Sequence, residues 1–107
     1  MPYVVLTIWF PPHKGREVGL KALEVIKKVS GDKYVGKNIL SGALMRTKDG
    51  IKGITIAEIK EGQLEAAIAQ ATDMLEMYSE VEGLNGQIDI MASMGEALSS
   101  VGLKVPE

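Results

Sequence analysis

The chain of 107 residues contains no cysteine and a single histidine. Without thiols it cannot form disulfides, use a thiolate nucleophile or hold zinc through cysteine. One histidine excludes a histidine-rich metal site and any catalytic scheme that needs two. Acid–base chemistry by carboxylates and binding in an apolar pocket are the activities left.

The chain also lacks a large excess of charge of either sign. The 12 basic and 14 acidic residues give a net charge of -2, and neither sign forms a block. Nucleic acid and membrane are therefore not expected as partners. No apolar run is long enough to span a bilayer, and the apolar N-terminal stretch lacks the basic leader of a signal peptide. We expect one cytoplasmic domain over residues 1–107, with no metal and no cofactor.

Residues 2–12 read PYVVLTIWFPP and predict the strand around which the fold is organised. Successive strand side chains point to opposite sides, and here both sides are mostly apolar. Such a strand lies at the centre of a sheet that is covered on both faces. The closing prolines end it, because neither can donate a ladder hydrogen bond.

Apolar spacing predicts the remaining elements. A helix of about sixteen residues should end near Ser30, and a second should open at residues 61–62 and end at Gly83. Strands are expected over residues 38–47, 51–60 and 87–92, the last of them at an edge. Ser93 and Glu96 have capping-box spacing and predict a short terminal helix that covers something apolar.

This order predicts an α+β, ferredoxin-like βαββαβ sheet with the first and third strands central and a short C-terminal helix. Its two long helices cover only one face of the sheet. The pattern does not decide which face that is, although small Gly42, Gly53 and Ala57 would let a helix approach closely. The other face would expose a large apolar patch, so we expect it to pack against a second copy.

The turn at residues 48–50 contains Asp-Gly, a strong hairpin signal. If Asp49 and Gly50 are the loop residues, Leu44 lies opposite Thr55. Leu40 then shares the face of Leu44, and Ile56 lies on the other face.

The whole chain resembles the dimeric α+β-barrel superfamily, which includes proteins similar to antibiotic biosynthesis monooxygenases. The matching features are its length, its element order, the segment YVVLTIWF and the phrase MYSEVEGLNGQIDIMAS. The resemblance implies two sheets that face each other across a homodimer, with a small cavity on each. Haem-degrading members use an Asn, Trp and His set, but Trp9, His13 and Asn38 do not reproduce that arrangement. No catalytic residue is transferred.

Five residues are candidate ligand contacts. Thr7 and Trp9 share one strand face and could line a cavity, where the indole N–H or the hydroxyl would orient a ligand. His13 follows the central strand, a common place for α/β ligand sites. Burial of Glu58 or Asp89 would give either carboxylate a pKa suited to a general base. The structural alternatives are core packing for Trp9, an exposed loop for His13 and edge exposure for the carboxylates.

These features favour a homodimeric binding module with a small apolar cavity near Thr7, Trp9 and Asp89. The alternative is a cofactor-independent monooxygenase or isomerase for a small aromatic or polyketide-like substrate, with Asp89, Glu58 or His13 as base. A third hypothesis is a tautomerase, whose base would be the Pro2 amine freed by loss of the initiator methionine. No arginine pair is placed to hold a dicarboxylate, and we expect the methionine to be retained.

Overall fold

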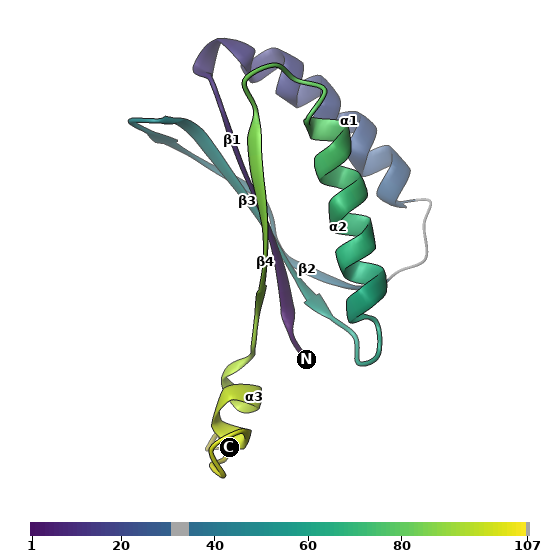
Figure 1. Ribbon diagram of the computed structural model, residues 1–107, viewed down its shortest axis with the longest axis vertical. Coiled ribbons are helices and arrows are strands. Elements are labelled where there is room, and N and C mark those ends of the chain that lie inside the picture. Colours follow the sequence, from purple (N-terminus) through teal and green to yellow (C-terminus); the bar gives the residue numbers. More distant parts are fainter. Residues whose placement is uncertain (31–34, 107) are drawn as a thin grey trace.

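The computed structural model describes residues 1–30 and 35–106 (Figure 1). Its elements follow the predicted order, and each predicted strand boundary lies within two residues of the observed one. The elements are β1 (Tyr3–Phe10), the 3-10 turn η1 (Pro12–Lys14), α1 (Gly15–Ser30), β2 (Gly36–Thr47), β3 (Gly50–Ile59), α2 (Leu64–Tyr78), β4 (Asn85–Met91) and α3 (Met94–Ser99). None of the described helices has the length and apolar character needed to cross a membrane.

The four strands form one antiparallel sheet in the order β2-β3-β1-β4. The prediction that the first and third strands are central is therefore confirmed, as is the edge position of β4. Together with two long helices on one face, this is the ferredoxin-like α+β fold (Figure 1).

The helices cover the face of β1 that carries Leu6, Ile8 and Phe10. These side chains are buried together with Val18 of α1 and Val81, which follows α2. A close helix approach does occur on this face, but at a different glycine from those expected. A Cβ atom at Gly86 of β4 would overlap Leu75 of α2, so α2 packs directly on the edge strand there.

The opposite face of the sheet has no helix over it, and we call it the open face. It carries the other side chains of β1 together with those directly paired to them on β3 and β4. Its β1 and β3 positions are mostly apolar, whereas its β4 positions are mostly polar. The larger apolar members are Tyr3, Val5, Trp9, Ile54, Ile56 and Met91.

The β2–β3 hairpin differs in register from the prediction. Thr47 pairs with Gly50, so the loop residues are 48–49 and Leu44 lies opposite Gly53 rather than Thr55. The Thr47 hydroxyl holds the turn by donating to the Gly50 carbonyl at 2.7 Å. Gly50 has φ 118°, and a Cβ there would lie 2.6 Å from the Phe10 carbonyl oxygen, so only glycine fits this close approach.

A second difference in the hairpin lies near Gly42, which has φ 67°. The pairing between β2 and β3 shifts between Asn38 and Leu40 and again between Leu40 and Ala43. Leu40 is consequently paired with Ile56 and shares the open face, not the face of Leu44. Bulges of this kind change the side to which a strand residue points, and periodicity alone does not reveal them.

Helix α3 has the predicted capping box. The Ser93 hydroxyl accepts from the Glu96 N–H at 3.1 Å, and the Glu96 carboxylate accepts from the Ser93 N–H at 2.8 Å. The expectation that this helix covers something apolar is wrong within the single described chain. No residue of α3 is buried, and the helix projects from the end of β4 away from the sheet and helices (Figure 1).

Candidate functional site

An apolar cavity of about 180 Å³ lies on the helix-covered face of the sheet, between α1 and the β2–β3 hairpin. We call it the helix-side cavity. Among the described residues that line it, none is charged. Four of its lining positions are glycines, two on α1 and two on the hairpin: Gly15, Gly19, Gly42 and Gly53.

Because these glycines have no side chains, they leave the space unfilled. A Cβ at Gly15, Gly19 or Gly42 would meet no other atom within 4 Å, so all three positions border open space. The prediction that Gly42 lets a helix approach closely is therefore wrong, and a Cβ at Gly53 would meet Leu44 and Ile8 rather than a helix. The prediction is confirmed at Ala57, which packs against the buried cluster that contains Ala67 and Ala71 of α2. Leu44, beside Gly42 and Gly53 on the hairpin, stays 65% exposed because α1 packs against α2 rather than against β2.

Two of the residues that line the helix-side cavity, Tyr78 and Thr55, carry a hydroxyl group. Tyr78 of α2 is partly buried, and this burial raises the pKa of its phenol, so the ring is neutral at physiological pH. The Thr55 hydroxyl accepts a hydrogen bond from the Gly42 N–H at 3.2 Å and keeps its own proton as a donor. The cavity can therefore enclose an uncharged apolar molecule and orient it through hydroxyl contacts.

The predicted residues Thr7 and Trp9 lie on the open face, away from this cavity. Thr7 is 6% exposed between its neighbouring strands. Trp9 is half-buried and pairs across the strands with Lys52, whose ammonium nitrogen lies 5.7 Å from the ring centroid. A cation over an indole face is attracted electrostatically, which holds the Trp9 ring against the sheet.

The carboxylates Glu58 and Asp89 also lie on the open face, but on different strands, with β1 between them. Asp89 is exposed and accepts from Gln87 Nε2 at 2.8 Å, whereas Glu58 is partly buried. His13 is exposed in η1, beyond the end of β1. The sheet thus brings four of the five residues to one face and leaves His13 apart. A second copy on this face would change their burial, so their role in ligand binding stays a prediction.

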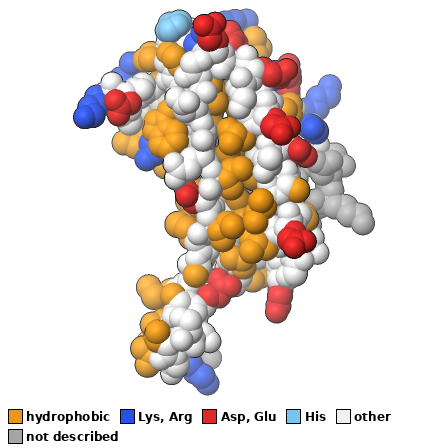
Figure 2. All heavy atoms as spheres, viewed as in Figure 1, with side chains coloured by type: hydrophobic (Ala, Val, Ile, Leu, Met, Phe, Trp, Pro, Cys, Tyr) orange, Lys and Arg blue, Asp and Glu red, His pale blue; other side chains and the backbone are white. Residues whose placement is uncertain are grey.

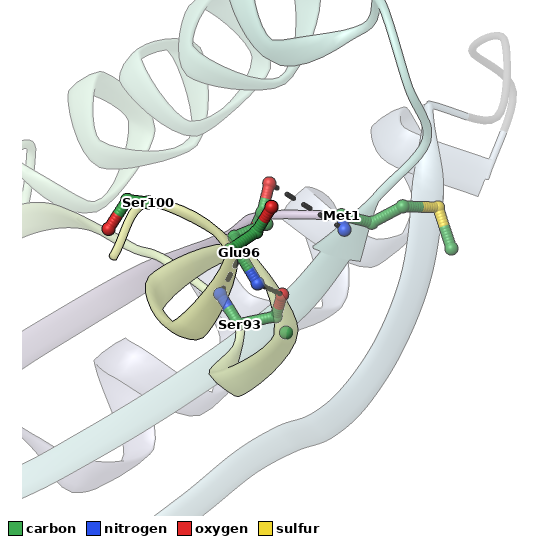
Figure 3. A pocket seen from close by; sticks show the side chains of 6 residues that line it. Met1, Ser93, Glu96 and Ser100 are labelled. Carbon is green, nitrogen blue, oxygen red and sulfur yellow. Dashed lines mark hydrogen bonds and ion pairs between the residues drawn. The ribbon is translucent and has the colours of Figure 1, made fainter. Parts of the chain in front are cut away.

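A second hollow lies beside α3 and is open to solvent (Figure 3). The Glu96 carboxylate lies 3.6 Å from the Met1 amino group and also closes the capping box. The hydrogen bond from the Ser93 N–H lowers the pKa of Glu96, with smaller contributions from the Ser93 hydroxyl and the amino terminus. The Glu96 carboxylate and the Ser93 hydroxyl are already hydrogen-bonded within α3, so this hollow offers less to a ligand than the helix-side cavity. In residues 1–30 and 35–106, no cluster of side chains could hold a metal ion.

The sequence pattern did not predict the helix-side cavity. A usable signal was present: Gly15, Gly19 and Ala22 recur along one side of α1, and Gly53 faces them from the hairpin. Aligned small residues can mark either a close approach or a void. Only the position of α1 distinguishes the two.

Comparisons with known proteins support the fold. No protein-family model matches the chain, and no curated protein is significantly similar. A crystal structure of an antibiotic biosynthesis monooxygenase is similar to it, with 16% identity over 88% of this chain and 99% of that one, and a TM-score of 0.56. A monooxygenase from ActVA-Orf6 of Streptomyces coelicolor, in complex with nanaomycin D, is 17% identical over 87% and 88%, with a TM-score of 0.53.

A de novo designed protein, Foldit4, matches equally well. It is 11% identical over 86% of this chain and 97% of that one, with a TM-score of 0.54. At such identities the likeness establishes the shared ferredoxin-like fold and does not carry an activity.

Proposed function

We propose that this protein is a homodimer that binds a small, uncharged, largely apolar molecule in the helix-side cavity of each protomer. The observation that carries the proposal is the cavity itself, an apolar space lined by glycines, by aliphatic and aromatic side chains, and by Thr55 and Tyr78, which carry hydroxyl groups. Packed protein interiors contain few voids larger than a water molecule, so an apolar space of this size is a natural ligand site.

The volume restricts the ligand. Pockets for drug-sized molecules have volumes of roughly 300–1,000 Å³. The helix-side cavity has about 180 Å³, close to the size of engineered apolar cavities that hold benzene. A single six-membered ring fits this space. A ring with one hydroxyl or carbonyl group would also use the polar groups of Tyr78 and Thr55.

The homodimer is supported by the open face. Trp9, Ile54 and Ile56 are partly exposed on this face around the buried Val5, and no helix of the described chain lies over the face. Contiguous apolar surface of this kind marks interaction sites in soluble proteins. A two-fold dimer buries the same patch of both copies at once.

Phenol and toluene provide the test. Both fit by size, but only phenol can exchange a hydrogen bond with Tyr78 or Thr55. We expect phenol to bind with a dissociation constant near 1 mM, which for seven heavy atoms is about 0.6 kcal/mol per atom and within the known range. Tyr78→Phe should weaken phenol at least threefold and leave toluene unchanged, as measured by NMR shifts of the Met74 methyl group. If neither compound moves that signal, the proposed site is wrong.

The alternative function is a cofactor-independent monooxygenase or isomerase. Its support is that two similar structures are monooxygenases, one of them in complex with nanaomycin D. A catalytic base would then come from the open face of the dimer or from η1. Dioxygen uptake with aromatic hydroquinone substrates, compared between the wild type, Asp89→Asn and His13→Ala, tests this: turnover that both variants leave intact would remove both residues from the mechanism.

A further inference from the structure

The segment after β4 carries exposed apolar side chains with nothing over them. We call residues 93–106 the C-terminal arm. Figure 2 shows hydrophobic side chains gathered along this projecting segment. Four of its larger apolar side chains are between 46% and 68% exposed, namely Met94, Val101, Leu103 and Val105.

The arm nevertheless has a defined local structure. The capping box closes the start of α3, and the other end has the paired hydrogen bonds of a Schellman motif, from Leu103 N–H to the Leu98 carbonyl at 2.8 Å and from Gly102 N–H to the Ser99 carbonyl at 3.1 Å. Gly102 has the positive φ of 78° that this motif requires. Isolated helices shorter than about 12 residues are marginal in water, so caps alone do not stabilise the six residues of α3.

The position of the arm selects its binding partner. β4 ends at Met91, which pairs with Tyr3 on the open face and is 44% exposed. Met91 therefore links the open face to the start of the arm. The contact between the arm and the chain's own N-terminus is an exposed ion pair, Met1 with Glu96, and it covers none of the exposed apolar side chains.

The area of the open face also points to a second copy. Four strands about 4.8 Å apart, with about 26 Å of length for the eight residues of β1, give a footprint of roughly 500 Å². A stable interface buries roughly 800 Å² on each partner. The arm lies where it can add to the area that the sheet buries.

We infer that the C-terminal arm packs against a second copy of this chain and extends the dimer interface beyond the sheet. This inference rests on the proposed homodimer. It assigns the exposed side chains of Met94 and Val101 to the partner's surface and explains why so short a helix is capped at both ends.

The test is a charge-balanced double variant, Met94→Glu with Val101→Lys. Glutamate at the start and lysine at the end of α3 are both favoured by the helix dipole, so the arm keeps its fold and the net charge is unchanged. The matched control is Leu20→Lys with Leu23→Glu on α1, where the side chains are 52% and 65% exposed. Circular dichroism checks the fold of both variants, and sedimentation equilibrium gives the dimer dissociation constant.

We expect the arm variant to weaken the dimer at least tenfold and the control to change it less than threefold. A dimer dissociation constant of the arm variant that stays within threefold of the wild-type value would overturn the inference. That result is expected if the arm instead covers its own chain or another protein. A wild-type protein that stays monomeric at 100 µM would refute both the arm contact and the homodimer. Phenol binding in the helix-side cavity is measured separately and can survive either result.

Discussion

Filling the helix-side cavity from α1 should stabilise the protein and block its ligand. Gly19 lies within α1 on the side that faces the cavity, and a Cβ there meets nothing within 4 Å. Gly19→Ala tests the helix alone, because alanine adds only a methyl group. Gly19→Leu adds an isobutyl group that reaches into the cavity mouth.

The expected stabilities follow from two separate effects. Replacing an interior helical glycine by alanine stabilises by about 1 kcal/mol, and leucine has nearly the same helix propensity. Full burial of a leucine side chain stabilises by roughly 1.5–3 kcal/mol. A leucine at position 19 would be only partly buried at the mouth of the cavity, so we expect about 1 kcal/mol from its burial. The free energy of unfolding should therefore rise by about 1 kcal/mol for Gly19→Ala and about 2 kcal/mol for Gly19→Leu, or about 4 and 8 °C in Tm.

The assays are urea denaturation for stability and phenol titration followed by NMR for binding. Gly19→Leu should lower phenol affinity at least tenfold, whereas Gly19→Ala should leave it within twofold of the wild type. Two results would refute the reasoning. Gly19→Leu that is less stable than Gly19→Ala would mean that no space is available at this position, and equal phenol affinity in the two variants would place the ligand elsewhere.

Four further predictions concern other parts of the molecule. Ile54→Glu on the open face should convert the proposed dimer to a folded monomer in light scattering, while Leu23→Glu should not. Ser93→Ala should speed amide exchange in α3 about fivefold, as loss of about 1 kcal/mol of N-cap implies. The pKa of Glu96 is lowered in the fold, so the stabilisation that its carboxylate gives the cap should be complete above the usual carboxyl pKa of 4.5. It should be lost as the pH falls through the lowered pKa. The NMR shift of the Ser93 amide measures this loss. Pro2→Ala should leave fold and dimer intact, because the Pro2 carbonyl that accepts a backbone hydrogen bond at 2.8 Å is retained; loss of enol-keto turnover in this variant would instead support the tautomerase hypothesis.

Local interactions explain why so much of the element order could be predicted. The two apolar sides of β1, the helical spacing in α1 and α2 and the capping box at Ser93 and Glu96 each involve residues close in sequence. Strand alternation also placed Thr7 and Trp9 on one face. The pairing of β3 and β4 with β1 puts Glu58 and Asp89 on the same face as these two residues. His13 lies in the 3-10 turn η1, where strand alternation does not apply.

The sequence by itself determined that β1 is central and that one sheet face has no helix of its own, because these follow from periodicity and chain order. It did not determine which face the helices cover, since both sides of β1 are apolar. Packing of Leu6, Ile8 and Phe10 against Val18 and Val81 decided that. The helix-side cavity was likewise decided in three dimensions, because its glycines become a void only where α1 packs on α2 and stands away from the hairpin.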